Sequence, residues 1–161
     1  MSHRTGTVAL VAALLVACGG TPRVGELEIS DAWARPTPAQ SSVAAVYMRI
    51  TSPVADELIE VSTTRSETAS LHAYAGSGSS TDGHMGHRSD GGPGSEEKMI
   101  EAGLVLEPNS PVEFAPGGMH IMLEGLKRPL IEGEPFELVL MFREAGERRV
   151  IVNVSTNAEY R

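Results

Sequence analysis

The sequence contains a single cysteine, Cys18, among its 161 residues. One cysteine cannot form a disulfide within the chain, and no Cys-x-x-Cys pair is present for thiol–disulfide exchange. A blue-copper electron-transfer site requires a cysteine thiolate among its metal ligands. Because we expect this one thiol to be modified near the N-terminus, we exclude both disulfide oxidoreductases and blue-copper proteins.

Aromatic and basic residues are also scarce. One Trp, three Tyr and three Phe amount to 4% of the chain, and 13 Lys and Arg stand against 21 Asp and Glu, giving a formal net charge of −8. This acidic balance argues against nucleic acid as a partner. The sequence also lacks a Ser-His-Asp arrangement and a G-x-S-x-G motif, so we do not expect an enzyme.

The N-terminus has the pattern of a targeting segment. Arg4 supplies the positive charge, and Val8–Val16 is an apolar run too short to span a membrane, which predicts a signal peptide over residues 1–17. Ala17 before Cys18 resembles the lipobox of bacterial lipoproteins, so we expect residues 18–25 to be a lipidated tether. The protein would then be an extracytoplasmic lipoprotein, held at the cell membrane on its periplasmic or cell-surface side. An ordinary signal peptide followed by an unmodified cysteine is the alternative.

The remaining sequence has the period of β-strands. Eight or nine short runs alternate apolar and polar residues and are separated by turn signals such as Pro116-Gly117-Gly118. No segment has a convincing helical period. This pattern predicts one all-β domain over residues 26–155, a β-sandwich or Greek-key barrel, followed by a C-terminal tail over 156–161. Residues 75–97 are rich in Gly, Ser and Asp, and they predict a loop insert.

One predicted strand carries a candidate metal-binding pair. In Met119-His120-Ile121-Met122 the histidine and the second methionine are two residues apart, so they share one face of a strand. An imidazole nitrogen beside a thioether sulfur is a soft donor pair that suits Cu(I). A strand with one structural histidine and one core methionine is the alternative.

Two further residues complete a candidate donor set. His72 ends an apolar run and Met99 follows the predicted insert, and each alone would be interpreted as structural. With His120 and Met122 they form a set of two histidines and two methionines from three predicted strands. Neutral imidazole and thioether ligands favour Cu(I) over hard cations, which prefer oxygen, and they are a poor zinc set.

Several motifs resemble the PCu(A)C-type extracytoplasmic copper chaperones. These are the stretch EFAPGGMHIMLEGLKRPL, the segments Asp31–Pro36 and Ser70–His72, and residues 132–138; the resemblance covers roughly residues 26–154. It implies a cupredoxin-like Greek-key β-barrel that binds one Cu(I) and passes it to the copper centres of haem–copper cytochrome oxidases during assembly. The family motif maps onto His72, Met99, His120 and Met122.

The predicted insert contains a second group of soft donors. His84, Met85 and His87 are clustered at its centre. Met85 is an alternative to Met99 as the third ligand, although its Gly-rich surroundings would not fix a ligand in place. The cluster could also be a second site, for Cu(I) or for Cu(II), or a solvated loop with no role.

The expected function is therefore that of a copper carrier. The expected partners are a copper-accepting cytochrome oxidase subunit or another copper chaperone, with the membrane contacted through the lipid anchor and the protein a monomer. Copper sequestration and a β-sandwich lipoprotein that binds a non-metal ligand are the alternatives that the sequence leaves open.

Overall fold

The computed structural model describes residues 26–74, 97–100 and 103–156. These residues form ten β-strands and no helix, which confirms the predicted all-β class. The strands are β1 (Glu28–Ala34), β2 (Val43–Thr51), β3 (Asp56–Ser62), β4 (Thr68–Tyr74), β5 (Glu97–Met99), β6 (Leu104–Leu106), β7 (Pro111–Phe114), β8 (His120–Glu124), β9 (Phe136–Phe142) and β10 (Gly146–Val154).

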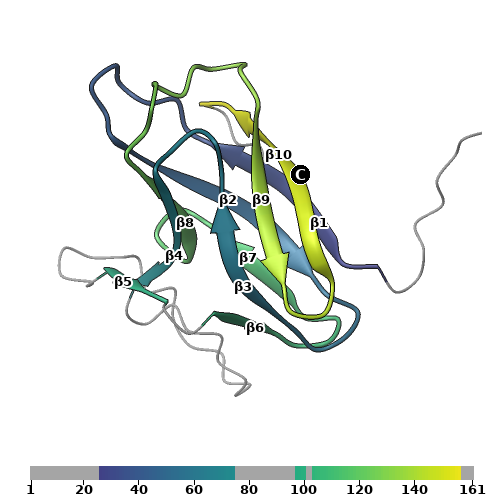
Figure 1. Ribbon diagram of the computed structural model, residues 1–161. Coiled ribbons are helices and arrows are strands. Elements are labelled where there is room, and N and C mark those ends of the chain that lie inside the picture. Colours follow the sequence, from purple (N-terminus) through teal and green to yellow (C-terminus); the bar gives the residue numbers. More distant parts are fainter. Residues whose placement is uncertain (1–25, 75–96, 101–102, 157–161) are drawn as a thin grey trace, which may run out of the picture.

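The strands belong to one continuous, curled sheet (Figure 1). The order across it is β5-β4-β8-β2-β1-β10-β9-β3-β6, and β7 pairs with β2 beside this path. Every pairing is antiparallel except that between β1 and β10, which is parallel. The sheet is therefore mixed, and strands from the two ends of the described chain meet at its centre.

Alternating residues of the strands build the core. Val46, Met48 and Ile50 of β2 are buried, and so are Leu138 and Leu140 of β9. Because side chains in a strand alternate between its two faces, each strand contributes one buried row and one outward row. The curl of the sheet brings the buried rows of both halves into one cluster, which includes Phe114, Ile121, Leu123 and Phe142.

Two elements carry only a weak sequence signal. The alternation of apolar and polar residues at the start of the domain stops at Ser30, yet β1 continues to Ala34. A register shift between Ser30 and Trp33, with Asp31 at a φ of +54°, breaks the alternation that would have marked the longer strand. The second such element is β6, whose three residues are too few to show a period.

A buried carboxylate fixes one corner of the sheet. Asp56 begins β3 and is only 6% exposed, and its two oxygens accept hydrogen bonds from the backbone N–H groups of Glu57, Glu144 and Ala145 at 2.7, 2.8 and 3.0 Å. The last two donors lie in the turn between β9 and β10. The carboxylate therefore ties that turn to β3, and these bonds satisfy a group that would otherwise destabilise the interior.

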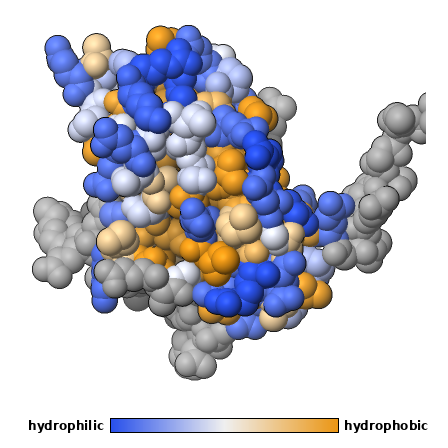
Figure 2. Space-filling view, viewed as in Figure 1, coloured by the Kyte–Doolittle hydropathy of each residue, from blue (hydrophilic) through white to orange (hydrophobic). Residues whose placement is uncertain are grey.

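The surface is mixed in character. On the face shown in Figure 2, polar residues cover the upper part and apolar residues gather lower down. Val105 of β6 and Ile59 of β3 are 64% and 45% exposed. None of the described residues belongs to a helix with the length and apolarity needed to cross a membrane.

Candidate metal centre

Three of the four predicted ligands lie in one row across neighbouring strands. The strand register pairs His72 of β4 with Met99 of β5 on one side and with His120 of β8 on the other. Residues directly opposite each other in antiparallel strands project to the same face of the sheet, with Cβ atoms about 5 Å apart. The His72 and His120 rings are 5.8 Å apart between centroids.

The fourth predicted ligand lies next to this row. Met122 follows His120 by two residues on β8, and its partner on β4 is Ser70. The core residues Leu71 and Ile121 lie between these positions and point to the opposite face. The four predicted ligands therefore share the outward face of the sheet, close to the edge that β5 forms.

The turn before β8 positions His120. Pro116 and Gly117 occupy the middle of a turn in which the Gly118 N–H donates to the Ala115 carbonyl at 2.9 Å. Gly117 has a φ of +80°, a conformation that glycine adopts without strain. The carbonyl of Gly118 then accepts a hydrogen bond from His120 Nδ1 at 3.1 Å. An imidazole that donates through Nδ1 binds a metal through Nε2, so the turn selects the tautomer suited to a ligand.

His72 has a different neighbour. Its Nε2 lies 3.0 Å from the hydroxyl oxygen of Ser70, two residues earlier on the same face of β4. A hydroxyl can either donate to or accept from an imidazole nitrogen. Ser70 therefore contacts the metal-binding face of the predicted ligand set without belonging to it.

Two aromatic residues extend the row beyond His120. The Tyr47 ring of β2 lies 6.4 Å from the His120 ring, and the Trp33 ring of β1 lies 4.7 Å from Tyr47. The register shift at Asp31 helps to place Trp33 opposite Tyr47, since it changes which β1 residues face this side. The result is a continuous apolar flank on one side of the candidate site.

Exposure increases across the site toward the sheet edge. His120 is only 4% exposed, His72 and Met122 are half-buried, and Met99 is 47% exposed. The site is therefore anchored in a covered position at β8 and opens at β5.

The donor set points to a soft metal. Among the described residues, no group of three or more His, Cys, Asp or Glu side chains is placed to hold a metal ion. The grouping formed here instead combines two imidazoles with two thioethers. Such neutral, soft ligands favour Cu(I) and fit poorly with Ca²⁺, Mg²⁺ or Zn²⁺.

The other predicted site residues lie outside the described residues. These are the proposed lipidation site Cys18 and the insert residues His84, Met85 and His87. Their roles stay predictions, and so does the choice of Met99 over Met85. The register of β4 and β5 supports that choice because it places Met99 directly beside His72.

Sequence reasoning overlooked three contributors to the site. Ser70, Tyr47 and the carbonyl of Gly118 all touch or flank the two histidines. Ser70 had a detectable signal, because it precedes His72 by two residues in a predicted strand and therefore shares its face. Tyr47 had none, because its proximity depends on how β2 and β8 pair.

The fold just described is that of a PCuAC-type β-domain. The copper-bound PCuAC domain from PmoF2 superposes with a TM-score of 0.60 at 24% identity, covering 83% of this chain and 96% of that one. The apo PCuAC domain from PmoF1 superposes with a TM-score of 0.63 at 24% identity, covering 83% of this chain and 97% of that one. The Cu(I) form of DR1885 from Deinococcus radiodurans superposes with a TM-score of 0.57 at 24% identity, covering 91% of this chain and 87% of that one. The predicted cupredoxin-like, PCu(A)C-type fold is thereby confirmed.

The chain belongs to the LpqE-like lipoprotein family, whose sequence profile matches residues 27–154. It is also 42% identical over 60 residues to Lxx21020 of Leifsonia xyli subsp. xyli (strain CTCB07), whose name describes a lipoprotein. That alignment covers 36% of this chain and 36% of the relative, so the chain matches about a third of the relative's length.

Proposed function

We propose that this protein is an extracytoplasmic Cu(I) carrier that hands its ion to an acceptor protein and catalyses no reaction. The observation that carries the proposal is the meeting of His72, Met99, His120 and Met122 on one outward face of β5, β4 and β8. Copper is the cargo of this site. Two relatives of the same fold are described as copper-bound or as a Cu(I) form, which supports the choice of metal.

The site suits a carrier because its ligands can bind copper and still release it. Neutral imidazole and thioether donors leave the bound Cu(I) with its single positive charge, and no thiolate competes to retain it. An acceptor that offers a thiolate can therefore take the ion by ligand exchange. Met99, the most exposed donor, is the first ligand to be replaced, and His120 is the last.

We propose delivery to the copper centre of a haem–copper cytochrome oxidase, either directly to its copper-binding subunit or through another copper chaperone. The lipoprotein descriptions of the family and of its relative support a location on the outer side of the cell membrane, anchored through Cys18. Such an anchor would hold the carrier in the same membrane as its acceptor.

Copper sequestration would use the same face without delivery, and a cellular experiment separates the two. If the protein delivers copper, a deletion strain loses oxidase activity and added copper restores it. Copper sensitivity with normal oxidase activity would instead establish sequestration.

The binding site itself is tested by anaerobic titration of residues 18–161 with Cu(I) against a chromogenic Cu(I) chelator. Cys18→Ser is included so that the thiol cannot bind the ion. We expect one Cu(I) to be held in competition with the chelator, with affinity reduced by Met99→Ala and unchanged by Met141→Ala. Met141 is a half-buried methionine on β9, remote in the sheet order from β4 and β8, so it is a matched control.

Other outcomes would revise or overturn the proposal. Loss of binding in Met85→Ala, with Met99→Ala unaffected, would move the third ligand into the insert. A second Cu(I) or a Cu(II) that disappears on replacing His84 and His87 would establish a secondary site there. A protein that never competes with the chelator is not a copper carrier.

A further inference from the structure

Ser70 lies at a corner of the outward face of β4, β5 and β8 that carries the four predicted ligands, here called the proposed copper face. It lies two residues before His72 on β4 and directly opposite Met122 on β8, while His72 lies opposite His120. Ser70, His72, His120 and Met122 therefore form a two-by-two group of neighbouring side chains on one face. Ser70 is the one member of this group that is not a soft donor, and its oxygen lies 3.0 Å from His72 Nε2.

This contact shows which way the imidazole of His72 points. Because Nε2 lies against Ser70, it is directed along β4 toward the level of Met122. An ion that touches both His72 and Met122 must lie on that side of the ring. His120 also presents Nε2 as its metal-binding nitrogen, because its Nδ1 donates to Gly118. Both histidines thus offer the same ring nitrogen to the site.

We propose that the hydroxyl of Ser70 competes with copper for the Nε2 lone pair of His72. In the copper-free protein the hydroxyl donates its hydrogen to this nitrogen, and the imidazole carries its own proton on Nδ1. When Cu(I) binds, the lone pair passes to the metal and the hydroxyl rotates away. No proton is lost or gained, since the imidazole stays neutral. This inference rests on the proposed function.

The competition weakens copper binding and assists release. Each time the ion departs, the hydroxyl returns to the nitrogen, so the copper-free site is stabilised by a hydrogen bond that the loaded site lacks. A hydrogen bond of ordinary net strength changes a binding constant by about 3- to 10-fold. Ser70 is therefore a positioning residue that tunes the site toward transfer.

The test compares Ser70→Ala with two matched variants in the Cu(I) titration, again on residues 18–161 with Cys18→Ser. Ser70→Ala should bind Cu(I) about 3- to 10-fold more tightly and release it more slowly. Ser70→Thr keeps a hydroxyl at this position and should stay close to the wild type. Thr68→Ala removes a hydroxyl from the same face of β4, where it lies 3.5 Å from a Glu124 oxygen, and should change nothing.

A measurement on the copper-free protein tests the hydrogen bond directly. Nitrogen-15 NMR of the imidazoles should show His72 protonated on Nδ1, with an Nε2 resonance that moves in Ser70→Ala and not in Thr68→Ala. A His72 that carries its proton on Nε2 would overturn the inference.

The affinity data separate failure of this inference from failure of the proposed function. A wild type that binds copper, together with a Ser70→Ala variant of equal or weaker affinity, overturns the competition and leaves the carrier intact. A wild type that does not bind Cu(I) overturns the carrier itself.

Discussion

Two polar clusters in this domain are bonded in opposite ways. At the β3 corner, the Asp56 carboxylate accepts its three hydrogen bonds from backbone N–H groups, which the sheet and a turn hold in place. On the proposed copper face, His72 contacts a hydroxyl that can rotate, and His120 is held at Nδ1 by a backbone carbonyl. Asp56 and His120 are about equally buried, at 6% and 4% exposed.

The difference separates a structural polar group from a proposed ligand-binding one. Burial alone does not distinguish them, because both are covered. What distinguishes Asp56 from His72 is whether the partner can leave: Asp56 is fixed by main-chain donors, whereas the rotating Ser70 hydroxyl can give up the His72 nitrogen to an ion. His120 is also fixed by a main-chain group, but at Nδ1, which is not the nitrogen proposed to bind the metal. Changes at Asp56 should therefore affect folding, and changes on the proposed copper face should affect copper binding.

The largest effect is expected at the buried ligand. Replacing His120 by glutamine removes the imidazole, and Cu(I) affinity should fall by more than about 100-fold, since loss of an outer-shell partner alone reduces affinity 10- to 100-fold. The chelator titration measures this, and circular dichroism should show that the β-fold persists. A His120→Gln protein that is folded and still binds copper normally would remove His120 from the ligand set.

At the Asp56 corner we expect a loss of stability without a change in copper affinity. Asp56→Asn replaces an anionic acceptor with a neutral amide whose NH₂ cannot accept the backbone donors. The free energy of unfolding should fall by about 1.5–3 kcal/mol, the range for hydrogen bonds to a charged group. Urea denaturation measures the change. Copper affinity of the folded variant should equal that of the wild type, and a large change there would break the comparison.

Asp56 also gives the stability a pH dependence. Burial raises the pKa of its carboxyl, but the backbone N–H groups of Glu144, Glu57 and Ala145 together outweigh burial, so the pKa lies below the ordinary 3.8. A depressed pKa stabilises the fold above pH 3.8, and this stability is lost as the pH falls through the lower folded-state value. Urea midpoints measured from pH 5 downward should converge for wild type and Asp56→Asn, and curves that stay parallel would contradict this.

Replacing Arg65 should change the unfolding free energy less than replacing Asp56, and should not lower it. This arginine is 7% exposed, and among the described residues its Nε and Nη2 have no hydrogen-bond partner. Burial, and then Arg128, lower the pKa of its guanidinium, while the Phe136 ring lies 5.7 Å from it. Arg65→Met should leave the unfolding free energy unchanged or raise it by about 1 kcal/mol. A clear loss in urea denaturation would show that Arg65 has a partner in solution.

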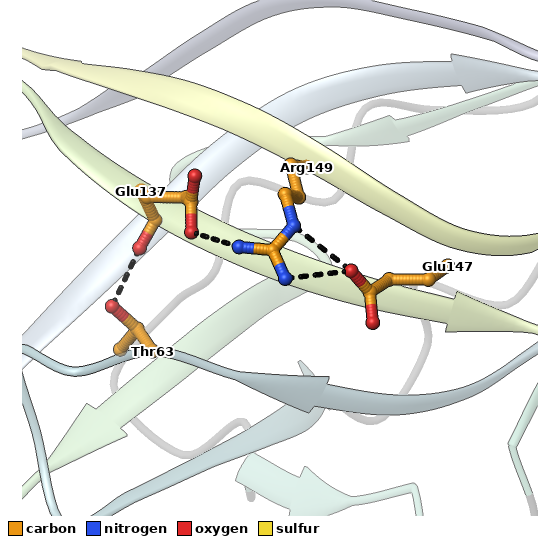
Figure 3. A network of polar contacts seen from close by, with 4 residues as sticks. All are labelled: Thr63, Glu137, Glu147 and Arg149. Carbon is orange, nitrogen blue, oxygen red and sulfur yellow. Dashed lines mark hydrogen bonds and ion pairs between the residues drawn. The ribbon is translucent and has the colours of Figure 1, made fainter.

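The smallest effect is expected at the exposed network in Figure 3. Arg149 of β10 bonds Glu147 and Glu137 at 2.8 Å each, and Glu147 and then Glu137 raise the pKa of its guanidinium. The arginine side chain is 60% exposed, so water screens these pairs. Arg149→Gln should leave the thermal midpoint and its salt dependence unchanged. A salt-sensitive decrease would show that the network stabilises the sheet.

The His120 and Met122 part of the candidate site could be predicted because these two residues are close in sequence. The two-residue period placed His120 and Met122 on one face, and the Pro-Gly-Gly turn before them marked the start of a strand. The same period could have placed Ser70 beside His72. It was overlooked because a serine in a strand carries no distinctive chemistry until its neighbours are known.

The rest depends on pairing between distant segments. The register that brings His72 opposite both Met99 and His120 arises when three strands align, and no local pattern specifies it. Trp33 reaches its position through the irregularity at Asp31, which interrupts the alternation on which a sequence-based prediction relies. The three residues of β6 are held by pairing with β3, beyond the reach of any local signal.

The parallel pairing of β1 with β10 has a consequence for the order of folding. Trp33 and Ala34 pair with Asn153 and Val154, near the far end of the described chain, and this contact joins β5-β4-β8-β2-β1 to β10-β9-β3-β6. Contacts between such distant residues form slowly, because a long loop must close first. The sheet therefore cannot be completed on a nascent chain until its last strand has emerged. Deleting Val152–Val154 should give a species in which β1 does not pair with β10.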